Sequence, residues 1–348
     1  MIRFLLYPFS LIYGTILWLR RKCYKKGIFP SKTFSTPTIC IGNLAVGGTG
    51  KTPHTEYIIN KLQDFNLAIL SRGYKRNTRG ALCTCQLTEK EKNAQNLGDE
   101  PTQYLRKSPN IPLAVAEKRA EGMELLQKNY PNLDLIVLDD AYQHLAVNYN
   151  CKILLTPFNH LYVDDCPFPA GRLREFPSAA KHADIIIVTK SPDNLTDNEI
   201  SSIKQRLQIN NCQYLFFTKI AYKKLLPFSP NQSIKLSSKT EVLLVTAIAN
   251  HTPLLQYLKT QFTNIQTITF QDHHIFSESD IDKIISQFYQ TNNPNKIVIT
   301  TEKDIPRLEC ASKNIISLLP VFVAPIEVRF LFNEDQFYSI IKSYVRKS

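Results

Sequence analysis

The chain has 348 residues, of which 43% are hydrophobic and 21% charged, and its formal net charge is +12. This length favours about two domains, and the apolar fraction is that of an ordinary globular protein with a full core. The positive charge indicates an acidic partner, which could be nucleic acid, an anionic membrane surface or a phosphorylated substrate. The sequence has no zinc-finger spacing and no aromatic RNA-binding motif. We therefore expect the acidic partner to be a membrane surface or a phosphorylated substrate, and we expect no binding to nucleic acid.

The first 26 residues combine an apolar stretch at positions 4–19 with a basic cluster at positions 20–26. The stretch is shorter than the roughly 20 apolar residues that a spanning helix needs, and no cleavage site of a signal peptide follows it. Tyr13 and Trp18 suit the membrane interface, and the basic cluster suits anionic headgroups on the cytoplasmic side. We therefore predict that residues 1–26 form an N-terminal membrane-associating helix. The alternative is a helix that packs on its own domain.

A phosphate-binding loop is predicted between an apolar strand at residues 38–41 and a helical pattern at residues 56–62. The loop contains Gly47, Gly48, Thr49, Gly50, Lys51 and Thr52. Its glycines allow backbone N–H groups to surround phosphates, and the helix N-terminus adds a partial positive charge. We expect Lys51 to reach the β- and γ-phosphates of a bound nucleotide and Thr52 to bind Mg²⁺. The full P-loop pattern, G-x-x-x-x-G-K-[ST], has glycine where this chain has Ala45. The strand before the loop and the helix after it are nevertheless both present in the sequence pattern.

A second apolar strand, at residues 135–138, ends in two carboxylates, Asp139 and Asp140. Charges at the carboxyl end of a buried strand lie where open α/β sheets bind ligands. We predict that one of the two holds Mg²⁺, directly or through water, and the sequence leaves open which one does so. A helix-capping role is the alternative for one of them.

Strand-like apolar runs alternate with helical stretches, which predicts an α/β fold. A P-loop NTPase-like domain with a mainly parallel sheet is expected over residues 27–213, with strands at 38–41, 67–70, 113–116, 135–138, 152–155 and 184–189. Residues 214–224 are expected to form an extended linker. A smaller Rossmann-like α/β domain is expected over residues 214–325, with strands near 241–246, 265–270 and 296–300. Residues 326–348 are expected to form a C-terminal helix.

Further short segments follow one another in a specific order. They are Ser71-Arg72-Gly73-Tyr74-Lys75, Gly98-Asp99-Glu100-Pro101, Ala116-Glu117-Lys118-Arg119, Leu138 to His144, Pro169 to Glu175, Asp184 to Lys190, Asp272 to Phe276 and Thr301-Glu302-Lys303-Asp304. Together with the phosphate-binding loop, this ordered set resembles the lipid A 4′-kinases, also called tetraacyldisaccharide 4′-kinases. The chain departs from the family at Ala141-Tyr142, where Gly-Phe is usual; the aromatic ring is kept, but the conformational freedom of glycine is lost.

The resemblance implies transfer of the γ-phosphate of ATP to the 4′-hydroxyl of a tetraacylated glucosamine disaccharide 1-phosphate, a lipid A precursor. It also implies that Asp99 and His273 form the catalytic pair, because both match the family's motifs. A carboxylate braced by an imidazole can accept the proton of a sugar hydroxyl. His273 lies in the second domain, so we expect the active site in an interdomain cleft that closes during the reaction.

Further candidates for substrate or phosphate contacts are Asn43, Arg72, Lys75, Arg119 and His144. For the three basic side chains the alternative is an ordinary solvated surface charge. His144 could instead orient one of the two carboxylates at the end of the second strand.

These observations together predict an ATP- and Mg²⁺-dependent kinase on the cytoplasmic face of a bacterial inner membrane. The main alternative is a membrane-associated P-loop nucleotide switch, either a GTPase or an ATPase. Thr189-Lys190 ends a strand as guanine-recognition motifs do, but Asp193 is one place too far along the chain for that motif. A soluble small-molecule kinase would leave the N-terminal segment unexplained. The sequence leaves the oligomeric state open.

Overall fold

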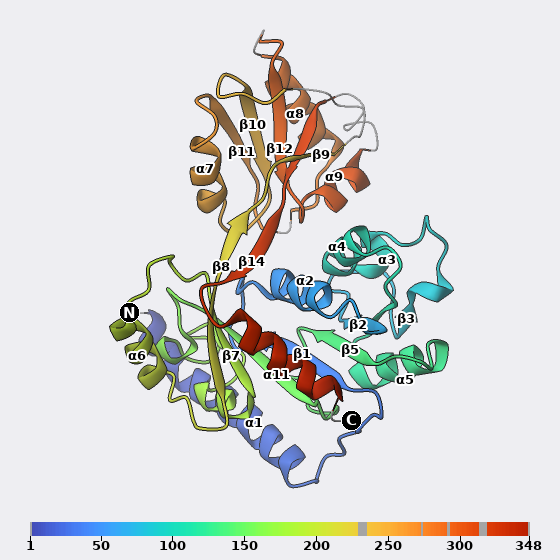
Figure 1. The fold of residues 1–348 in the computed structure, drawn as a ribbon, viewed down its shortest axis with the longest axis vertical. Helices are drawn as coiled ribbons and strands as arrows, with labels where there is room; N and C mark the ends of the chain where they lie inside the picture. Colours follow the sequence, from blue (N-terminus) through green and yellow to red (C-terminus); the bar gives the residue numbers. More distant parts are fainter. Residues whose placement is uncertain (1, 229–234, 273, 291–292, 313–318, 347–348) are drawn as a thin grey trace.

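The computed structural model describes residues 2–228, 235–272, 274–290, 293–312 and 319–346. The chain forms two α/β units, one built on a nine-stranded sheet and one on a five-stranded sheet. The strands β8 (Tyr214–Tyr222) and β14 (Ile326–Phe330) connect them (Figure 1). These two strands pair antiparallel with each other, so the units are joined by a two-stranded arm.

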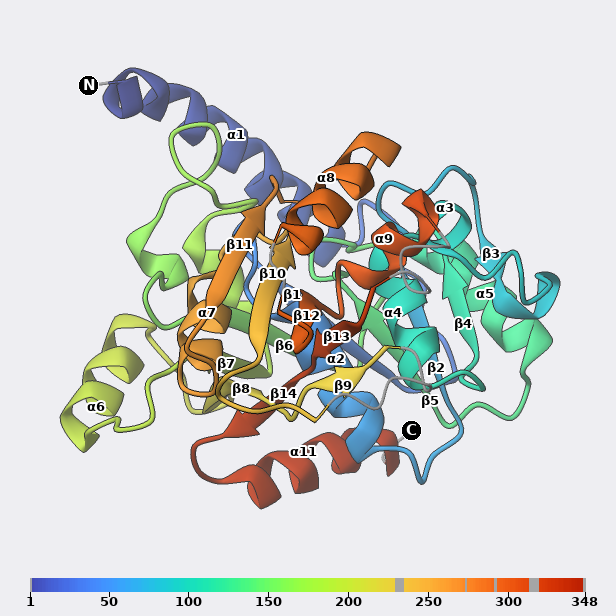
Figure 2. The ribbon, with the colours of Figure 1, turned by 90° about the horizontal axis from the view of Figure 1, so that it is seen from above.

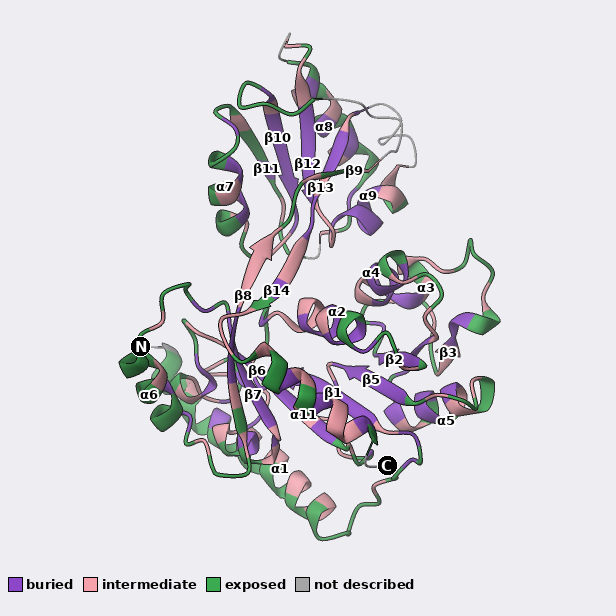
Figure 3. Cartoon of the chain, viewed as in Figure 1, coloured by how far each residue is buried: buried purple, intermediate pink, exposed green. Residues whose placement is uncertain are grey.

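The large sheet has the strand order β14-β8-β7-β6-β1-β5-β2-β4-β3. Its other strands are β1 (Thr38–Asn43), β2 (Leu67–Ser71), β3 (Leu82–Cys83), β4 (Leu113–Val115), β5 (Leu135–Asp139), β6 (Cys151–Pro157) and β7 (Ile185–Thr189). The strands from β8 to β4 pair in parallel, and only β14 and β3, at the two edges, pair antiparallel. All residues of β1, β2, β4, β5 and β7 are buried, as in parallel sheets that helices cover on both faces (Figure 3).

Alternate residues of β1 enter different cores because successive side chains of a strand point to opposite faces. Ile39 and Ile41 pack with residues of α2 (Lys51–Lys61), α4 (Asp99–Lys107) and α11 (Glu334–Arg346). Cys40 packs with residues of α5 (Arg119–Asn129) and α6 (Asp197–Arg206) on the other face. A short helix, α3 (Ala94–Leu97), precedes α4. The large unit is therefore a sheet between two helical layers.

The small unit has the strand order β11-β10-β12-β13-β9. Its strands are β9 (Leu226–Pro227), β10 (Glu241–Thr246), β11 (Ile265–Thr269), β12 (Lys296–Thr301) and β13 (Val321–Ala324), and its helices are α7 (Thr252–Lys259), α8 (Glu278–Tyr289) and α9 (Ile305–Ala311). The first four strands of this order are parallel, and β9 pairs antiparallel with β13. Helix α9 faces α4 of the large unit (Figure 1).

The α/β architecture with a large, mainly parallel sheet is confirmed, and every strand expected from an apolar run is present. Residues 214–222, expected as an extended linker, form β8, which links the units and also extends the large sheet by pairing with β7. Residues 326–330 were expected at the start of the C-terminal helix but form β14, and the helix α11 begins at Glu334. The alternation of apolar and polar residues over 326–330 indicates a strand, and the prediction missed it.

Helix α1 (Ile2–Lys25) runs along the outside of the large unit (Figure 2). One face is attached to residues 165–176: the Ser10 hydroxyl accepts a hydrogen bond from the Ala170 N–H (2.8 Å), and Arg21 forms two hydrogen bonds with Glu175 (2.7 and 2.8 Å). The other face exposes large apolar side chains, among them Phe4, Leu5, Phe9, Ile12, Ile16 and Leu19. Within the described residues, no helix is long and apolar enough to cross a bilayer. The helix thus packs on its own unit and still has an uncovered apolar face.

His54 attaches α2 to the large sheet. Its Nδ1 lies 2.7 Å from the Gly50 carbonyl oxygen, and its Nε2 lies 2.9 Å from the Thr218 hydroxyl on β8. A carbonyl oxygen can only accept, so Nδ1 carries the proton, and Nε2 of the neutral ring accepts from Thr218. Burial lowers the pKa of His54 to about 4.

We predict that the free energy of unfolding decreases as the pH falls from 6.5, the ordinary pKa of a histidine, toward 4, the pKa of His54 in the folded chain. In this range His54 takes up a proton when the chain unfolds. His54→Asn keeps a donor near the Gly50 carbonyl but has no titrating ring. Its stability should therefore fall less steeply than that of the wild type, by up to about 1.4 kcal/mol per pH unit. Denaturant unfolding of both proteins at several pH values across this range measures the difference. Parallel curves would contradict the neutral, buried state of His54.

Candidate active site

The phosphate-binding loop joins the end of β1 to the start of α2. Gly47 (φ 115°) and Gly50 (φ 91°) have the positive φ angles that glycine adopts most readily. Asn43 is fully buried, and its side-chain amide donates to the Ala45 carbonyl oxygen (2.6 Å) and to the Thr49 hydroxyl (2.8 Å). We expected Asn43 to contact substrate or phosphate; the structure places it inside the loop, where it stabilises the loop conformation.

Residues at the end of β7 also bind the phosphate-binding loop. The Thr189 hydroxyl donates to the Thr49 carbonyl oxygen (2.8 Å), and Lys190 Nζ donates to the Gly48 carbonyl oxygen (2.6 Å). Residues 46–48 remain exposed, and Lys51 and Thr52 follow as the first two residues of α2, both half-buried. The loop is thus fixed at its base and open at its tip.

Residues 172–174 form a third support for the loop. The Val46 N–H donates to the Arg172 carbonyl oxygen (2.8 Å), and the Arg174 N–H donates to the Leu44 carbonyl oxygen (2.6 Å). These backbone bonds place the Arg174 side chain beside the loop. The segment that holds α1 therefore also contacts the phosphate-binding loop.

Asp139 ends β5 next to the start of α2. Its carboxylate accepts hydrogen bonds from the Tyr104 hydroxyl (3.0 Å) and the Thr55 hydroxyl (3.4 Å), and only 4% of the residue is exposed. Burial, together with the neighbouring charge of Asp140, raises the pKa of Asp139 to about 6, although Lys51 acts in the opposite direction. Its negative charge is thus only partly compensated.

Asp140 has the opposite electrostatic balance. Its Oδ1 accepts a hydrogen bond from Arg174 (2.8 Å) and lies 3.7 Å from Lys51 Nζ. Burial opposes ionisation, but the charges of Lys51 and Arg174 outweigh it and lower the pKa of Asp140. Asp140 has a positive φ of 47°, whereas Ala141 does not. The residue that the family usually has as glycine therefore does not need glycine's freedom in this turn.

Arg119 binds the backbone of the turn at Asp140. Only 2% of the residue is exposed, and its guanidinium donates to the carbonyl oxygens of Ala116 (2.5 Å) and Asp140 (3.3 Å). Among the described residues, no group accepts a hydrogen bond from its Nε. Arg119 is therefore not the solvated surface charge of the alternative, because its guanidinium is turned toward the backbone of the large unit. Its expected contact with substrate or phosphate stays a prediction.

Arg72 and Lys75 are exposed in the segment that follows β2. Lys75 Nζ lies 5.9 Å from the centre of the Tyr74 ring. Burial lowers the pKa of His144 to about 3, and the nearby charges of Arg119 and Arg72 act in the same direction. His144 is therefore a neutral side chain in a positively charged part of the site.

Asp99 begins α4 directly after Gly98. A Cβ atom on Gly98 (φ 95°) would lie 3.0–3.1 Å from backbone atoms of Gly73 and Tyr74, so glycine allows the two segments to pack closely. Asp99 Oδ2 accepts two hydrogen bonds from Arg307 of α9, one from the terminal nitrogen (2.5 Å) and one from Nε (2.9 Å). The small unit therefore reaches the predicted catalytic carboxylate.

His273, the predicted partner of Asp99, lies outside the described residues. On one side of it in the sequence, Asp272 lies 3.3 Å from Lys303 Nζ. On the other side, His274 Nε2 lies 2.9 Å from an oxygen of Asp280. His274 is thus held within the small unit, and the pairing of Asp99 with His273 stays a prediction.

The sequence did not identify the partners of the predicted carboxylates. Arg174 lies within the motif at residues 169–175, which marks it as a candidate without naming its partner. Tyr104 and Arg307 lie on helices that begin at or directly after such motifs, but neither residue belongs to one, and their contacts to Asp139 and Asp99 join distant parts of the chain.

The chain matches the family model described as tetraacyldisaccharide-1-P 4′-kinase over residues 2–346. It is 42% identical to a tetraacyldisaccharide 4′-kinase of Bacteroides thetaiotaomicron, over 99% of this chain and 93% of that protein. It is 38% identical to the Flavobacterium johnsoniae protein of the same name, over 100% and 98%. The crystal structure of LpxK from Aquifex aeolicus in complex with ATP is similar with a TM-score of 0.75 and 26% identity, over 99% of this chain and 100% of that one. The resemblance seen in the motifs is thus confirmed, and the chain belongs to the tetraacyldisaccharide 4′-kinase family.

Proposed function

We propose that this chain phosphorylates the 4′-hydroxyl of a tetraacylated glucosamine disaccharide 1-phosphate with ATP, in the biosynthesis of lipid A. The observation that carries the proposal is the placement of Lys51, at the start of α2, beside the paired carboxylates at the end of β5. Phosphoryl transfer depends on positioning and charge neutralisation, which this edge of the sheet offers. The family relationship supports the lipid substrate, and the ATP complex of the Aquifex aeolicus protein supports the nucleotide.

The fold and the loop support a P-loop NTPase-like mode of nucleotide binding. β1 lies between β5 and β6 in a parallel sheet, and the loop at its carboxyl end leads into α2. Backbone N–H groups of Gly47, Gly48, Thr49 and Gly50 would bind the phosphates, and the N-terminus of α2 adds its partial positive charge. Full-length relationship to kinases disfavours the alternative of a nucleotide switch.

The oxygen donors at this edge fit Mg²⁺. Thr52, Asp139 and Asp140 offer the hydroxyl and carboxylate oxygens that Mg²⁺ prefers. In the described part of the chain, no three His, Cys, Asp or Glu side chains gather into a metal site, so we expect phosphate oxygens to complete the coordination. When bound, the ion neutralises charge on the β- and γ-phosphates.

Asp99 is the proposed acceptor for the proton of the 4′-hydroxyl. As the hydroxyl oxygen bonds to the γ-phosphorus, the bond from that phosphorus to the β–γ bridging oxygen breaks and ADP leaves. The hydroxyl proton passes to the Asp99 carboxylate, and His273 remains its predicted partner.

We also propose that α1 binds the cytoplasmic face of the bacterial inner membrane. Phe4 is 86% exposed and Ile16 60%, and both lie on a helix whose last turns carry the basic residues of positions 20–25. An apolar face beside Lys and Arg suits a helix lying in the interface of an anionic membrane. This placement would bring the enzyme to an acylated substrate.

We predict that Lys51→Met lowers kcat/KM by about 10³-fold, because the variant loses the positive charge that stabilises the transferred phosphoryl group. Transfer of label from γ-labelled ATP to the disaccharide 1-phosphate in detergent micelles measures the effect. The control is Lys61→Met, in the last turn of the same helix, where Lys61 pairs with Glu334 at the surface. That variant should keep wild-type activity. Near-normal turnover of Lys51→Met would refute the phosphate-binding role.

Replacing Ile12 and Ile16 together by Glu should reduce binding to anionic vesicles by at least about 10-fold, because burying each side chain in the interface contributes about 1.5–3 kcal/mol. Both residues are on the uncovered face of α1. Co-sedimentation with phosphatidylglycerol vesicles measures binding, and Leu226→Glu, at an exposed position in the small unit, is the control. Equal sedimentation of the double variant and the wild type would place the membrane contact elsewhere.

A further inference from the structure

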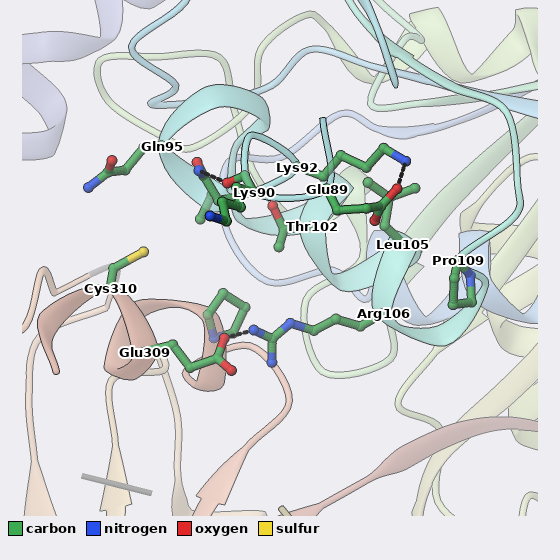
Figure 4. Close-up of a pocket in the computed structure, with 13 residues that line it drawn as sticks. Glu89, Lys90, Lys92, Gln95, Thr102, Leu105, Arg106, Pro109, Glu309 and Cys310 are labelled. Atoms are coloured by element: carbon green, nitrogen blue, oxygen red, sulfur yellow. Dashed lines mark hydrogen bonds and ion pairs between the residues drawn. The ribbon is translucent and has the colours of Figure 1, made fainter. Parts of the chain in front are cut away.

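The small unit contacts the large unit through α9 and α4. Ion pairs between described residues cross from one helix region to the other: Asp99 with Arg307 (2.5 Å), Lys107 with Glu302 (2.7 Å), and Arg106 with Glu309. Figure 4 shows the Arg106–Glu309 pair in the pocket between residues 89–109 and α9. Only the first of these pairs involves a proposed reacting group, so Arg307 differs from its neighbours in what it contacts.

Arg307 is held in place by its own unit. The residue is 6% exposed, and one terminal nitrogen lies 3.4 Å from the Ala247 carbonyl oxygen and 3.5 Å from Asp304 Oδ1. Asp304 is fully buried and accepts hydrogen bonds from the Thr301 hydroxyl (2.7 Å) and the Ala247 N–H (3.1 Å). A guanidinium fixed in this way presents its remaining donors in one direction, toward the large unit.

The geometry at Asp99 is that of a group being oriented. The Nε and one terminal nitrogen of Arg307 both donate to Asp99 Oδ2. The planar guanidinium holds Oδ2 with two donors whose relative positions are fixed, whereas an ammonium group on its flexible stem would offer one donor and hold the oxygen less firmly. Because α4 fixes the backbone of Asp99 and Arg307 holds Oδ2, the contact limits how the carboxylate can turn.

We propose that Arg307 is a positioning residue for Asp99: it orients the carboxylate for the acceptor hydroxyl and compensates its charge. This inference rests on the proposed role of Asp99 as proton acceptor. It makes the reaction depend on docking of α9 against α4, because the orienting group belongs to the small unit and the carboxylate to the large one. The competing explanation is that Arg307 only holds the two units together.

Kinetics of Arg307→Met, Arg307→Lys and Arg106→Met separate the two explanations. Arg307→Met should lower kcat by about 100-fold, the cost of a misplaced reacting group, and should leave the KM for ATP within about 3-fold of the wild type. Arg307→Lys keeps a charge beside Asp304 but loses the planar fork, so it should fold like the wild type and lose about 10-fold in kcat. Arg106→Met breaks another pair across the same contact and should keep kcat within about 3-fold.

A double-mutant cycle with Asp99→Asn completes the test. If Arg307 acts through Asp99, adding Arg307→Met to Asp99→Asn should change kcat by less than about 3-fold. The positioning role would be overturned if the double variant lost kcat by the product of the two single losses. It would also be overturned if Arg307→Lys folded normally and kept the wild-type kcat. Equal losses of kcat in Arg106→Met and Arg307→Met would overturn it as well. If Asp99→Asn itself kept the wild-type kcat, the proposed role of Asp99 as proton acceptor would fail. A low kcat in Asp99→Asn together with a wild-type kcat in Arg307→Met would instead refute only the positioning role of Arg307.

Discussion

Two adjacent carboxylates at the end of β5 impose the constraint on which the site depends. Asp139 and Asp140 repel each other, and each must be compensated in a place that is largely shielded from water. Lys51 lies between the phosphate-binding loop and Asp140, and Arg174 binds Asp140 directly. The two acids consequently differ: the pKa of Asp139 is raised to about 6, and that of Asp140 is lowered. The neighbouring cations therefore compensate Asp140 more fully than Asp139, at the edge of the sheet where we propose that the phosphates bind.

The segment that contains Arg174 links Asp140 to helix α1 on the outside of the large unit. The next residue, Glu175, is nearly buried and forms a bidentate ion pair with Arg21 of α1. One short segment therefore contacts the helix with the uncovered apolar face, the phosphate-binding loop and Asp140. A helix that lies on the membrane would in this way be attached directly to the nucleotide site, as suits an enzyme whose substrate carries acyl chains.

Local sequence patterns predicted most of the fold, and long-range contacts explain what they missed. Buried strands and the glycine-rich loop were identifiable because periodicity and turn chemistry act over a few residues. The burial of Arg119 under the Asp140 turn could not be predicted, because it depends on how α5 packs under the end of β5. Asp99 and Arg307 are 208 residues apart, and nothing near either residue indicates that they meet. His273, which only the resemblance identified, lies outside the described residues.

The most direct test of the account is the identity of the product. The purified chain would be incubated with ATP, Mg²⁺ and the tetraacyl disaccharide 1-phosphate in mixed micelles, and the lipid would be analysed by proton–phosphorus correlation NMR. The account predicts one new phosphate monoester whose phosphorus couples to the proton at the 4′ position, formed in equal amount with ADP. Release of inorganic phosphate without a new lipid phosphate, or a phosphate at another hydroxyl, would contradict it.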